Sequence, residues 1–411
     1  MTQTTEAGRL TDDAIERMRR RVGIPQHSTR RPHNEWITWD GIRHFAIGNG
    51  DTNPLYSDRA YASGTHWKDV IGTPLFAIAC GTPVPTSWTP EEAEVMSGGD
   101  PFKGIGQYLA TERWTRGAPL RPGMQVARRD GLVDVSVREG SKFAGGVAVY
   151  LTYRHIYSDM ATGELVTSLD RTFVYAERDR SHRKTPMTEA DLRRDYTPAD
   201  IERIDAAYAA ESFRGGDHLV HSGDLAGTSL PAIVRGPFLL TDIIGLHVGW
   251  GFGELFGVGA LRAGYLNRQR IPGFYNANFF GAPDAVQRCH WEVEWAQSLG
   301  QPAPYDYGIQ RYMWMVQLVT NWMGDSGQIR SVNVAVTKFN YIGDTTWITG
   351  TVTQVRDDPS LGPVVTVRVE GRNQRDESTC WAEVEVLLPL DASGAPRQMP
   401  PIAPELGKLS K

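Results

Sequence analysis

The sequence has little of what marks several common classes of protein. Its 411 residues include three cysteines, too few for a disulfide framework. No stretch reaches the roughly 20 consecutive apolar residues that a membrane-spanning helix needs, so no membrane partner is expected. The net charge is 43 − 48 = −5, which does not favour binding to nucleic-acid phosphates. Residues 1–13 are polar and acidic without an apolar signal region, so the expected location is the cytoplasm.

Motifs of several enzyme classes are also missing or occur without the required context. The chain has no G-x-S-x-G and no P-loop, and the glycines of 245–264 form no dinucleotide-binding pattern. The string G-D-S-G at 324–327 matches a serine-protease motif, but it follows a predicted helix in a chain without a disulfide pattern, which favours chance. His218 and His221 lack a third ligand at useful spacing, so no metal site is expected.

The composition is that of a globular protein large enough for two domains. Hydrophobic residues make up 40% and charged residues 22%. Residues 177–200 are dense in charge and contain two prolines, which is typical of a surface connector. We therefore predict an N-terminal domain over 1–180, a charged linker over 181–225, a C-terminal domain over 226–395 and a tail over 396–411.

Each half has helical segments followed by strands. The predicted helices cover 10–22, 188–195, 198–210 and 308–323, and the last has almost no polar face. Alternating, β-branched runs predict antiparallel strands from about 107 to 176 and again between 331 and 389. Because helices and strands do not alternate along the chain, the predicted fold class is α+β. A sheet wrapped around one buried helix, occurring twice, accounts for this order.

The two halves can be aligned with each other. Asp40 corresponds to Asp242, Tyr56 to His290 and Asp58 to Glu292. Asp40 precedes Asp51 by 11 positions, whereas Asp242 precedes Asp284 by 42, so the second half carries an insertion of about 42 − 11 = 31 residues near 248–280. The insertion is rich in glycine and aromatic residues.

The segments FAIGNGDTNPLYSDRAYA (45–62) and GTSLPAIVRGPFLLTDII (227–244) resemble the MaoC-like acyl dehydratases, also called (R)-specific enoyl-CoA hydratases. The resemblance covers about residues 30–390, in the double hot-dog form with a FAS1-like dehydratase N-terminal domain. It implies two antiparallel sheets, each wrapped around a central helix, that form one continuous surface. It also implies a hydro-lyase that acts on a 2-enoyl or 3-hydroxyacyl thioester. A coenzyme A thioester would be the substrate, and no further cofactor is expected.

The family's motif is an Asp, then Asn-Pro, then a His five positions after the Asp. The first half keeps the Asp and Asn-Pro but has Tyr56 in place of the His, whereas the second half keeps Asp284 and His290 with one extra residue between them. The resemblance therefore implies that the second half is catalytic. His290 is the expected general base for water, and Asp284 is expected to hold that water or to deliver the C2 proton. Gly308 opens the apolar helix and is the expected oxyanion donor.

The insertion predicts a pocket for a bulky acyl group. Its predicted substrate-binding residues are Trp250, Phe274, Tyr275, Phe279 and Phe280, because aromatic rings offer much apolar contact area. The alternative is that the insertion caps the domain or forms a subunit interface.

Three further residues, Asp242, His247 and Cys289, are predicted to have no catalytic role. Asp242 and His247 also show a five-residue spacing, but the repeat places Asp242 at the start of the domain, so both are interpreted as bystanders. Cys289 is interpreted as a packing residue.

Two other functions stay open. The chain could be a dehydratase acting on carrier-protein-bound acyl chains in polyketide or lipid biosynthesis. Because neither half keeps the complete motif, it could also be a catalytically weak acyl-binding subunit. A homodimer, or a hetero-oligomer with another hot-dog subunit, is the corresponding expectation for protein partners.

Overall fold

The computed structural model describes residues 8–28, 31–177, 195–251 and 259–402. Its N-terminal half contains α1 (Asp12–Arg19), α2 (Trp39–Gly48), α3 (Pro54–Ser57), α4 (Arg59–Gly64), η1 (Phe76–Ala79), β1 (Thr82–Pro83), α5 (Pro90–Ser97), β2 (Gly106–Arg116), β3 (Val126–Ser141), β4 (Gly146–Asp159) and β5 (Leu165–Ala176). Its C-terminal half contains α7 (Pro198–Ala210), η3 (Gly223–Leu225), β6 (Ser229–Arg235), α8 (Leu240–Trp250), α9 (Arg262–Arg270), η4 (Pro272–Phe274), β7 (Tyr275–Ala277), β8 (Pro283–Ala285), η5 (Val286–His290), α10 (Val293–Ser298), α11 (Gly308–Met323), β9 (Gln328–Val336), β10 (Thr346–Asp358), β11 (Gly362–Asn373) and β12 (Ser378–Leu387).

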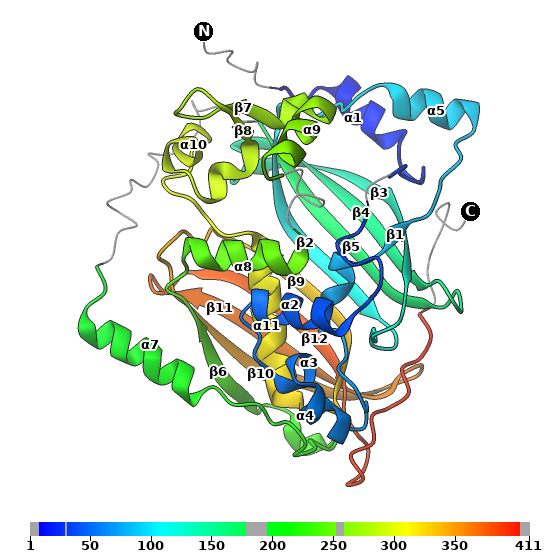
Figure 1. Cartoon of the computed structure of the whole chain (residues 1–411), viewed down its shortest axis with the longest axis vertical. Coiled ribbons are helices and arrows are strands. Elements are labelled where there is room, and N and C mark those ends of the chain that lie inside the picture. The colour runs from blue at the N-terminus through cyan, green and yellow to red at the C-terminus, as the bar shows by residue number, and fades with distance from the viewer. Residues whose placement is uncertain (1–7, 29–30, 178–194, 252–258, 403–411) are drawn as a thin grey trace.

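One large sheet carries both halves (Figure 1). Its strand order is β1-β3-β4-β5-β2-β9-β12-β11-β10-β6, and the pairings are antiparallel except for β1 with β3. The halves join where β2 pairs with β9, from Thr111 opposite Ala335 to Thr115 opposite Ser331. The predicted continuous surface is therefore confirmed, and its seam is the β2–β9 pair.

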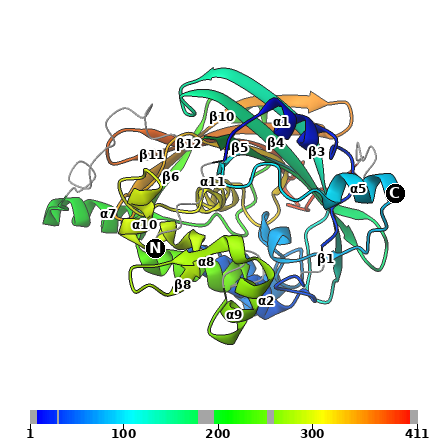
Figure 2. The same cartoon turned by 90° about the horizontal axis from the view of Figure 1, so that it is seen from above.

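Helix α11 is the core of the C-terminal half. Its residues from Ile309 to Met323 are all buried, because the sheet covers one side of the helix and other helices cover the opposite side (Figure 2). The helix begins and ends at the predicted residues, as expected for a segment that is apolar on almost every side. Within the described ranges, no helix combines the length and apolarity needed to cross a bilayer.

The N-terminal half differs from the prediction of one buried helix in each half. The corresponding segment, residues 67–80, is largely buried, but only the short 3₁₀ turn η1 within it is helical. Gly72 and Pro74 interrupt the apolar sequence, and Pro74 can neither donate a helical hydrogen bond nor follow a residue in helical conformation without strain. The inner face of the N-terminal sheet is therefore covered by irregular chain rather than by a long helix.

Helices α2 and α8 are the repeated elements that join the two halves on the far side of α11 (Figure 2). They cross at glycines: a Cβ atom on Gly48 would lie 2.4 Å from the carbonyl oxygen of Gly245, and one on Gly249 would lie 2.8 Å from that of His44. Such a close approach of two backbones excludes larger residues. The equivalent positions of Asp40 and Asp242 near the two helix starts agree with the predicted alignment.

Two peripheral helices lie where they are predicted. Helix α1 begins after Thr11, whose hydroxyl accepts a hydrogen bond from the Ala14 N–H, and the following acidic residues suit the positive end of the helix dipole. Helix α7 occupies Pro198–Ala210 inside the predicted linker. Residues 188–194 of the other predicted linker helix lie outside the described residues.

Candidate active site

His290 ends the 3₁₀ turn η5 and packs against the segment that leads into α11. Its Nδ1 lies 2.7 Å from the carbonyl oxygen of Tyr305, and its ring stacks on that of Tyr307 with centroids 3.7 Å apart. Because a carbonyl oxygen can only accept, Nδ1 carries the hydrogen and Nε2 keeps a lone pair. This tautomer is the one that a general base for water requires.

Burial determines the charge state of His290. It lowers the pKa of the imidazole to about 4, although the Tyr305 hydrogen bond and the charge of Asp306 act in the opposite direction. The side chain is therefore neutral at pH 7 and can accept a proton.

His247 of α8 lies beside this histidine, although the sequence analysis assigned it no role. Its Nε2 is 3.1 Å from the Tyr307 hydroxyl, and its ring lies 6.1 Å from that of Trp291. Burial and the neighbouring His290 lower its pKa to about 4. One sequence signal was available: on α8 the buried positions 243, 246, 247 and 250 follow helical spacing, so the histidine lies on the apolar face.

Gly308 begins α11 directly after Tyr307, whose ring stacks on that of His290. The N–H groups of a first helical turn have no partner within the helix; the Tyr307 N–H is satisfied by the Gln310 side chain at 3.2 Å. A Cβ atom on Gly308 would lie 3.4 Å from Val336 and 3.5 Å from Leu109. These residues belong to β9 and β2, so the start of α11 lies over the seam between the two half-sheets.

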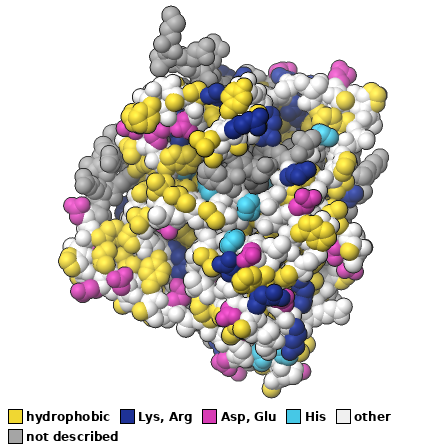
Figure 3. Space-filling view, in the orientation of Figure 1, with side chains coloured by type: hydrophobic (Ala, Val, Ile, Leu, Met, Phe, Trp, Pro, Cys, Tyr) yellow, Lys and Arg dark blue, Asp and Glu magenta, His cyan; other side chains and the backbone are white. Residues whose placement is uncertain are grey.

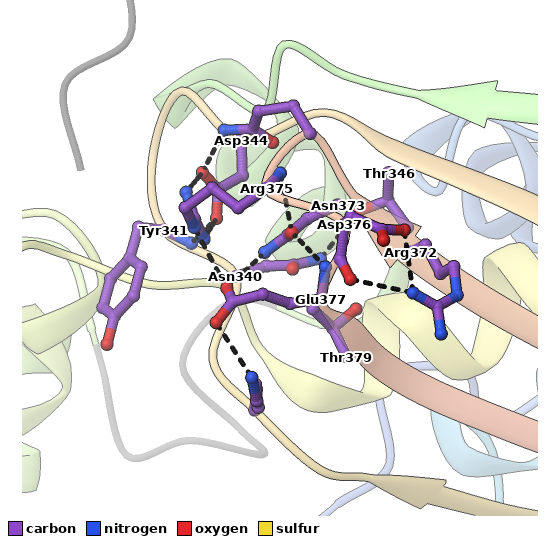
Figure 4. A network of polar contacts seen from close by, with 12 residues as sticks. Asn340, Tyr341, Asp344, Thr346, Arg372, Asn373, Arg375, Asp376, Glu377 and Thr379 are labelled. Carbon is purple, nitrogen blue, oxygen red and sulfur yellow. Dashed lines mark hydrogen bonds and ion pairs between the residues drawn. The ribbon is translucent and has the colours of Figure 1, made fainter. Parts of the chain in front are cut away.

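A network of paired charges fixes the segment that carries Tyr305 and Tyr307. The backbone N–H of Asp306 donates to the carbonyl of Asn340, and the Asp306 carboxylate pairs with Arg311 at 2.8 Å. The loop that contains Asn340 is held in turn by Asp344, which receives two hydrogen bonds from Arg375 at 2.6 and 2.7 Å (Figure 4). Tyr305 and Tyr307, the two residues that contact His290, are therefore positioned by the C-terminal sheet.

The structure does not bring Asp284 into contact with His290. In β8, one carboxylate oxygen of Asp284 accepts from the Asn278 amide at 3.2 Å and the other from the Ala285 N–H at 2.7 Å. No hydrogen bond joins it to His290 among the described residues. The β7–β8 hairpin holds the carboxylate, and the extra residue in this loop changes its register relative to the family motif.

The five predicted substrate-binding aromatics are separated in the structure. Trp250 is buried and lines a cavity, whereas Phe274 and Tyr275 are half-buried and pack edge to face. Phe279 and Phe280 stack on each other at the β7–β8 turn and are 72% and 77% exposed. Residues 252–258 of the insertion lie outside the described residues.

The motif of the first half forms a buried structural loop. Asn53 caps α3 and Asp58 caps α4 through their side-chain oxygens. Tyr56 is buried, and burial raises the pKa of its phenol far above the ordinary value, which excludes it as a base. Burial also raises the pKa of Asp51 to about 6, although the Asn53 N–H opposes the shift.

The G-D-S-G string at 324–327 lies against His218 in the structure, although neither was predicted to have a function. The Ser326 hydroxyl lies 3.4 Å from Nδ1 of His218, and the Tyr61 hydroxyl donates to Asp325 at 2.7 Å. Ser326 is 2% exposed, so the chain around it leaves no room for a substrate. In the part of the chain that the structure describes, no three His, Cys, Asp or Glu side chains are arranged to hold a metal ion.

Comparison with known proteins agrees with this architecture. Residues 26–168 match the model of the FAS1-like dehydratase domain region. A search of curated proteins found no match. A solved structure described as a MaoC-like dehydratase is 17% identical, with a TM-score of 0.57 over 90% of this chain and 98% of that chain. A putative MaoC domain protein dehydratase from Chloroflexus aurantiacus J-10-fl is 13% identical, with a TM-score of 0.50 over 95% and 100%.

The chain thus has a double hot-dog fold of the α+β class. The predicted resemblance to the MaoC-like dehydratases is confirmed, by the family model for the N-terminal half and by the fold for the whole chain.

Proposed function

We propose that this protein is a hydro-lyase that adds water to a 2-enoyl thioester, or removes it from a 3-hydroxyacyl thioester, with coenzyme A as the thiol and a bulky acyl group. His290 is the general acid–base and Gly308 the oxyanion donor. The reaction uses side chains and water and requires no further cofactor.

In the proposed reaction, Nε2 of His290 takes a proton from water while the water oxygen bonds to C3. The C2–C3 double bond becomes an enolate, whose oxygen accepts from the Gly308 N–H at the positive end of α11. The proton on Nε2 then passes to C2, which restores the thioester and the neutral imidazole. Since Asp284 is held elsewhere, Tyr307 and His247 position the imidazole in this scheme.

One observation carries the proposal. A neutral histidine, with Nδ1 hydrogen-bonded to a backbone carbonyl, lies beside the N-terminus of a buried helix. A base and an oxyanion donor next to each other are what hydration of a conjugated thioester needs.

A second candidate, the catalytically weak acyl-binding subunit, is favoured by two other observations. Asp284 does not contact His290, and α8 presents an exposed apolar stripe of Leu240, Ile244 and Val248 beside Ile47 of α2. Figure 3 shows hydrophobic side chains gathered over α8 on this face. Exposed apolar patches of this kind mark protein interfaces, and a second hot-dog subunit is the partner this candidate requires.

The test is a hydration assay with enoyl-CoA substrates of graded size. Turnover is measured as the loss of absorbance of the conjugated thioester. We expect turnover by the purified chain, a higher kcat/KM for bulky than for four-carbon substrates, and a loss of at least about a thousandfold for His290→Ala. The same assay with the acyl group on a carrier protein tests the dehydratase alternative, which predicts faster turnover of that thioester than of the coenzyme A thioester.

Two variants serve as controls. His44→Ala removes an exposed histidine, and Tyr56→Phe removes the hydroxyl that stands at the first-half motif position. Both should keep most of the activity. Activity that appears only when a neighbouring hot-dog protein is co-purified would replace the enzyme assignment by the subunit assignment.

A further inference from the structure

The N-terminal half contains a cavity of about 390 Å³ that the proposed reaction does not use. It lies between residues 26–28 and 31–33, the segment around Trp88 and Met96, the inner face of β3 and the end of α8. Its size falls within the range of small-molecule sites. The cavity is on the side of the sheet where, among the described residues, no long helix covers the N-terminal half.

The sheet wall of this cavity is charged rather than apolar. Arg128 and Asp130 alternate with outward-facing residues along β3, so both project from the inner face. Asp130 accepts from Arg128 at 2.9 Å and from His155 of β4 at 2.7 Å. Charges on an inner face are tolerated because each has a partner, and the pairing holds the Arg128 guanidinium in place.

The balance of charges in the lining is positive. Asp130 is the one acidic residue among the described residues that line the cavity, and Arg128 neutralises it. Arg31, which is exposed, contributes a further positive charge. The cavity therefore favours an anionic group.

Trp88, Met96 and Trp250 supply apolar surface to the rest of the lining. The indole N–H of Trp88 donates to the Pro25 carbonyl at 2.7 Å, and that of Trp250 donates to the Ile78 carbonyl at 3.1 Å. Because both N–H groups are engaged with backbone, the indoles offer a ligand their ring surfaces. Met96 adds a flexible apolar contact.

The cavity adjoins the candidate active site at the last turn of α8. Trp250 lines the cavity, and His247 lies three residues earlier on the same buried face, where it contacts Tyr307 beside His290. Positions three residues apart on a helix are separated by a rise of about 4.5 Å. An acyl chain that runs from His290 along this face of α8 would have its far end in the cavity.

We propose that this cavity binds an anionic group carried on an apolar body, and that it thereby selects thioesters with a second acidic end. The selection among thioesters rests on the proposed function, whereas the anion binding does not. Two sources have this chemistry: a carboxylate at the far end of the acyl chain, and the phosphorylated adenosine of coenzyme A.

Isothermal titration calorimetry with unreactive probes tests the binding. Decanedioate represents the acyl source, decan-1-ol is its uncharged reference, and adenosine 3′,5′-bisphosphate represents the coenzyme source. We expect one of the two anionic probes to bind wild type and to weaken at least tenfold in Arg31→Ala and in Trp88→Ala. The matched control is Arg129→Ala, which removes an exposed arginine from the opposite face of β3 and should change binding less than twofold.

The same variants are compared in the hydration assay. If the acyl source is correct, the ratio of kcat/KM for an enoyl-CoA with a terminal carboxylate to that for its uncharged counterpart falls about tenfold in Arg31→Ala and stays constant in Arg129→Ala. Binding of the bisphosphate alone assigns the cavity to the coenzyme. Probes that bind to all variants alike, or not at all, overturn the proposal. A protein that binds a probe through Arg31 but hydrates no thioester refutes the proposed function and leaves the cavity assignment intact.

Discussion

Burial shifts the pKa of several single side chains in this protein and so determines their protonation state. His290 and His247 are surrounded by aromatic rings, and the pKa of each is lowered to about 4 because the imidazolium form would lose its hydration. Asp51 shows the corresponding effect for an acid, with a pKa raised to about 6. At the residue scale, both histidines of the candidate site are therefore neutral at pH 7.

The neutral form of His290 predicts an unusual pH dependence. A general base works while it is unprotonated, so kcat/KM should fall only as the pH drops through about 4, and not near the 6.5 of an ordinary histidine. The imidazole resonance, assigned in nitrogen NMR by comparison with His290→Gln, should titrate at the same pH. A midpoint near 6.5 in both measurements would contradict the buried environment.

The raised pKa of Asp51 predicts a stabilising substitution. The folded state holds the Asp51 proton up to about pH 6, whereas the unfolded chain releases it near 3.8, so the wild type loses stability as the pH rises through this interval. Asp51→Asn removes that loss and can still accept the Asn53 N–H. We expect it to raise the free energy of unfolding by about 3 kcal/mol at pH 8. Urea unfolding at pH 8 and at pH 4 measures it, and an equal gain at both pH values would show that ionisation is not the cause.

At the scale of elements, α11 links the core to the candidate chemistry. Its body is buried on all sides, while its first turn lies beside His290 and over the β2–β9 seam. The helix therefore has to be rigid for stability and open at one end for a substrate.

Gly308→Ala separates these two roles. The added methyl would lie 3.4 Å from Val336, an ordinary contact distance, and alanine is the better helix former by about 1 kcal/mol. We expect unchanged or slightly higher thermal stability and at least a tenfold lower kcat/KM, because the methyl group occupies space next to the proposed oxyanion donor. Gly64→Ala in α4, where the added methyl meets nothing within 4 Å, is the matched control. Full activity in Gly308→Ala would show that Gly308 serves only as a turn residue and not as the oxyanion donor.

At the scale of the whole molecule, the two halves form one folding unit. The sheet continues across the β2–β9 pair, and one apolar core contains residues from Ile37 to Leu388. The close crossing of α2 and α8 adds a second connection between the halves.

This continuity predicts a single cooperative unfolding transition, although the chain is long enough for two domains. Circular dichroism and tryptophan fluorescence in guanidinium should give coincident curves, since neither half can lose its core without exposing that of the other. Two separate transitions would show that the β2–β9 seam is weak.

The family resemblance, the repeat and most of the elements could be predicted from the sequence because they depend on local patterns. Apolar residues on every side of 308–323 specify a buried helix, and alternation specifies the strands that flank it. The aligned Asp40 and Asp242 identified the equivalent helices α2 and α8. His290 could be chosen because its position in the repeat is a property of the chain itself.

The surroundings of His290 were decided by tertiary structure. His247 is 43 positions away in sequence, and only the packing of α8 against the start of α11 brings it next to Tyr307. The β7–β8 hairpin holds Asp284 away from His290. The charged inner face of β3 borders a cavity because irregular chain, and no long helix of the described part, covers the N-terminal sheet. Short-range patterns specify which elements form, whereas contacts between distant elements depend on how an insertion and two half-sheets pack together.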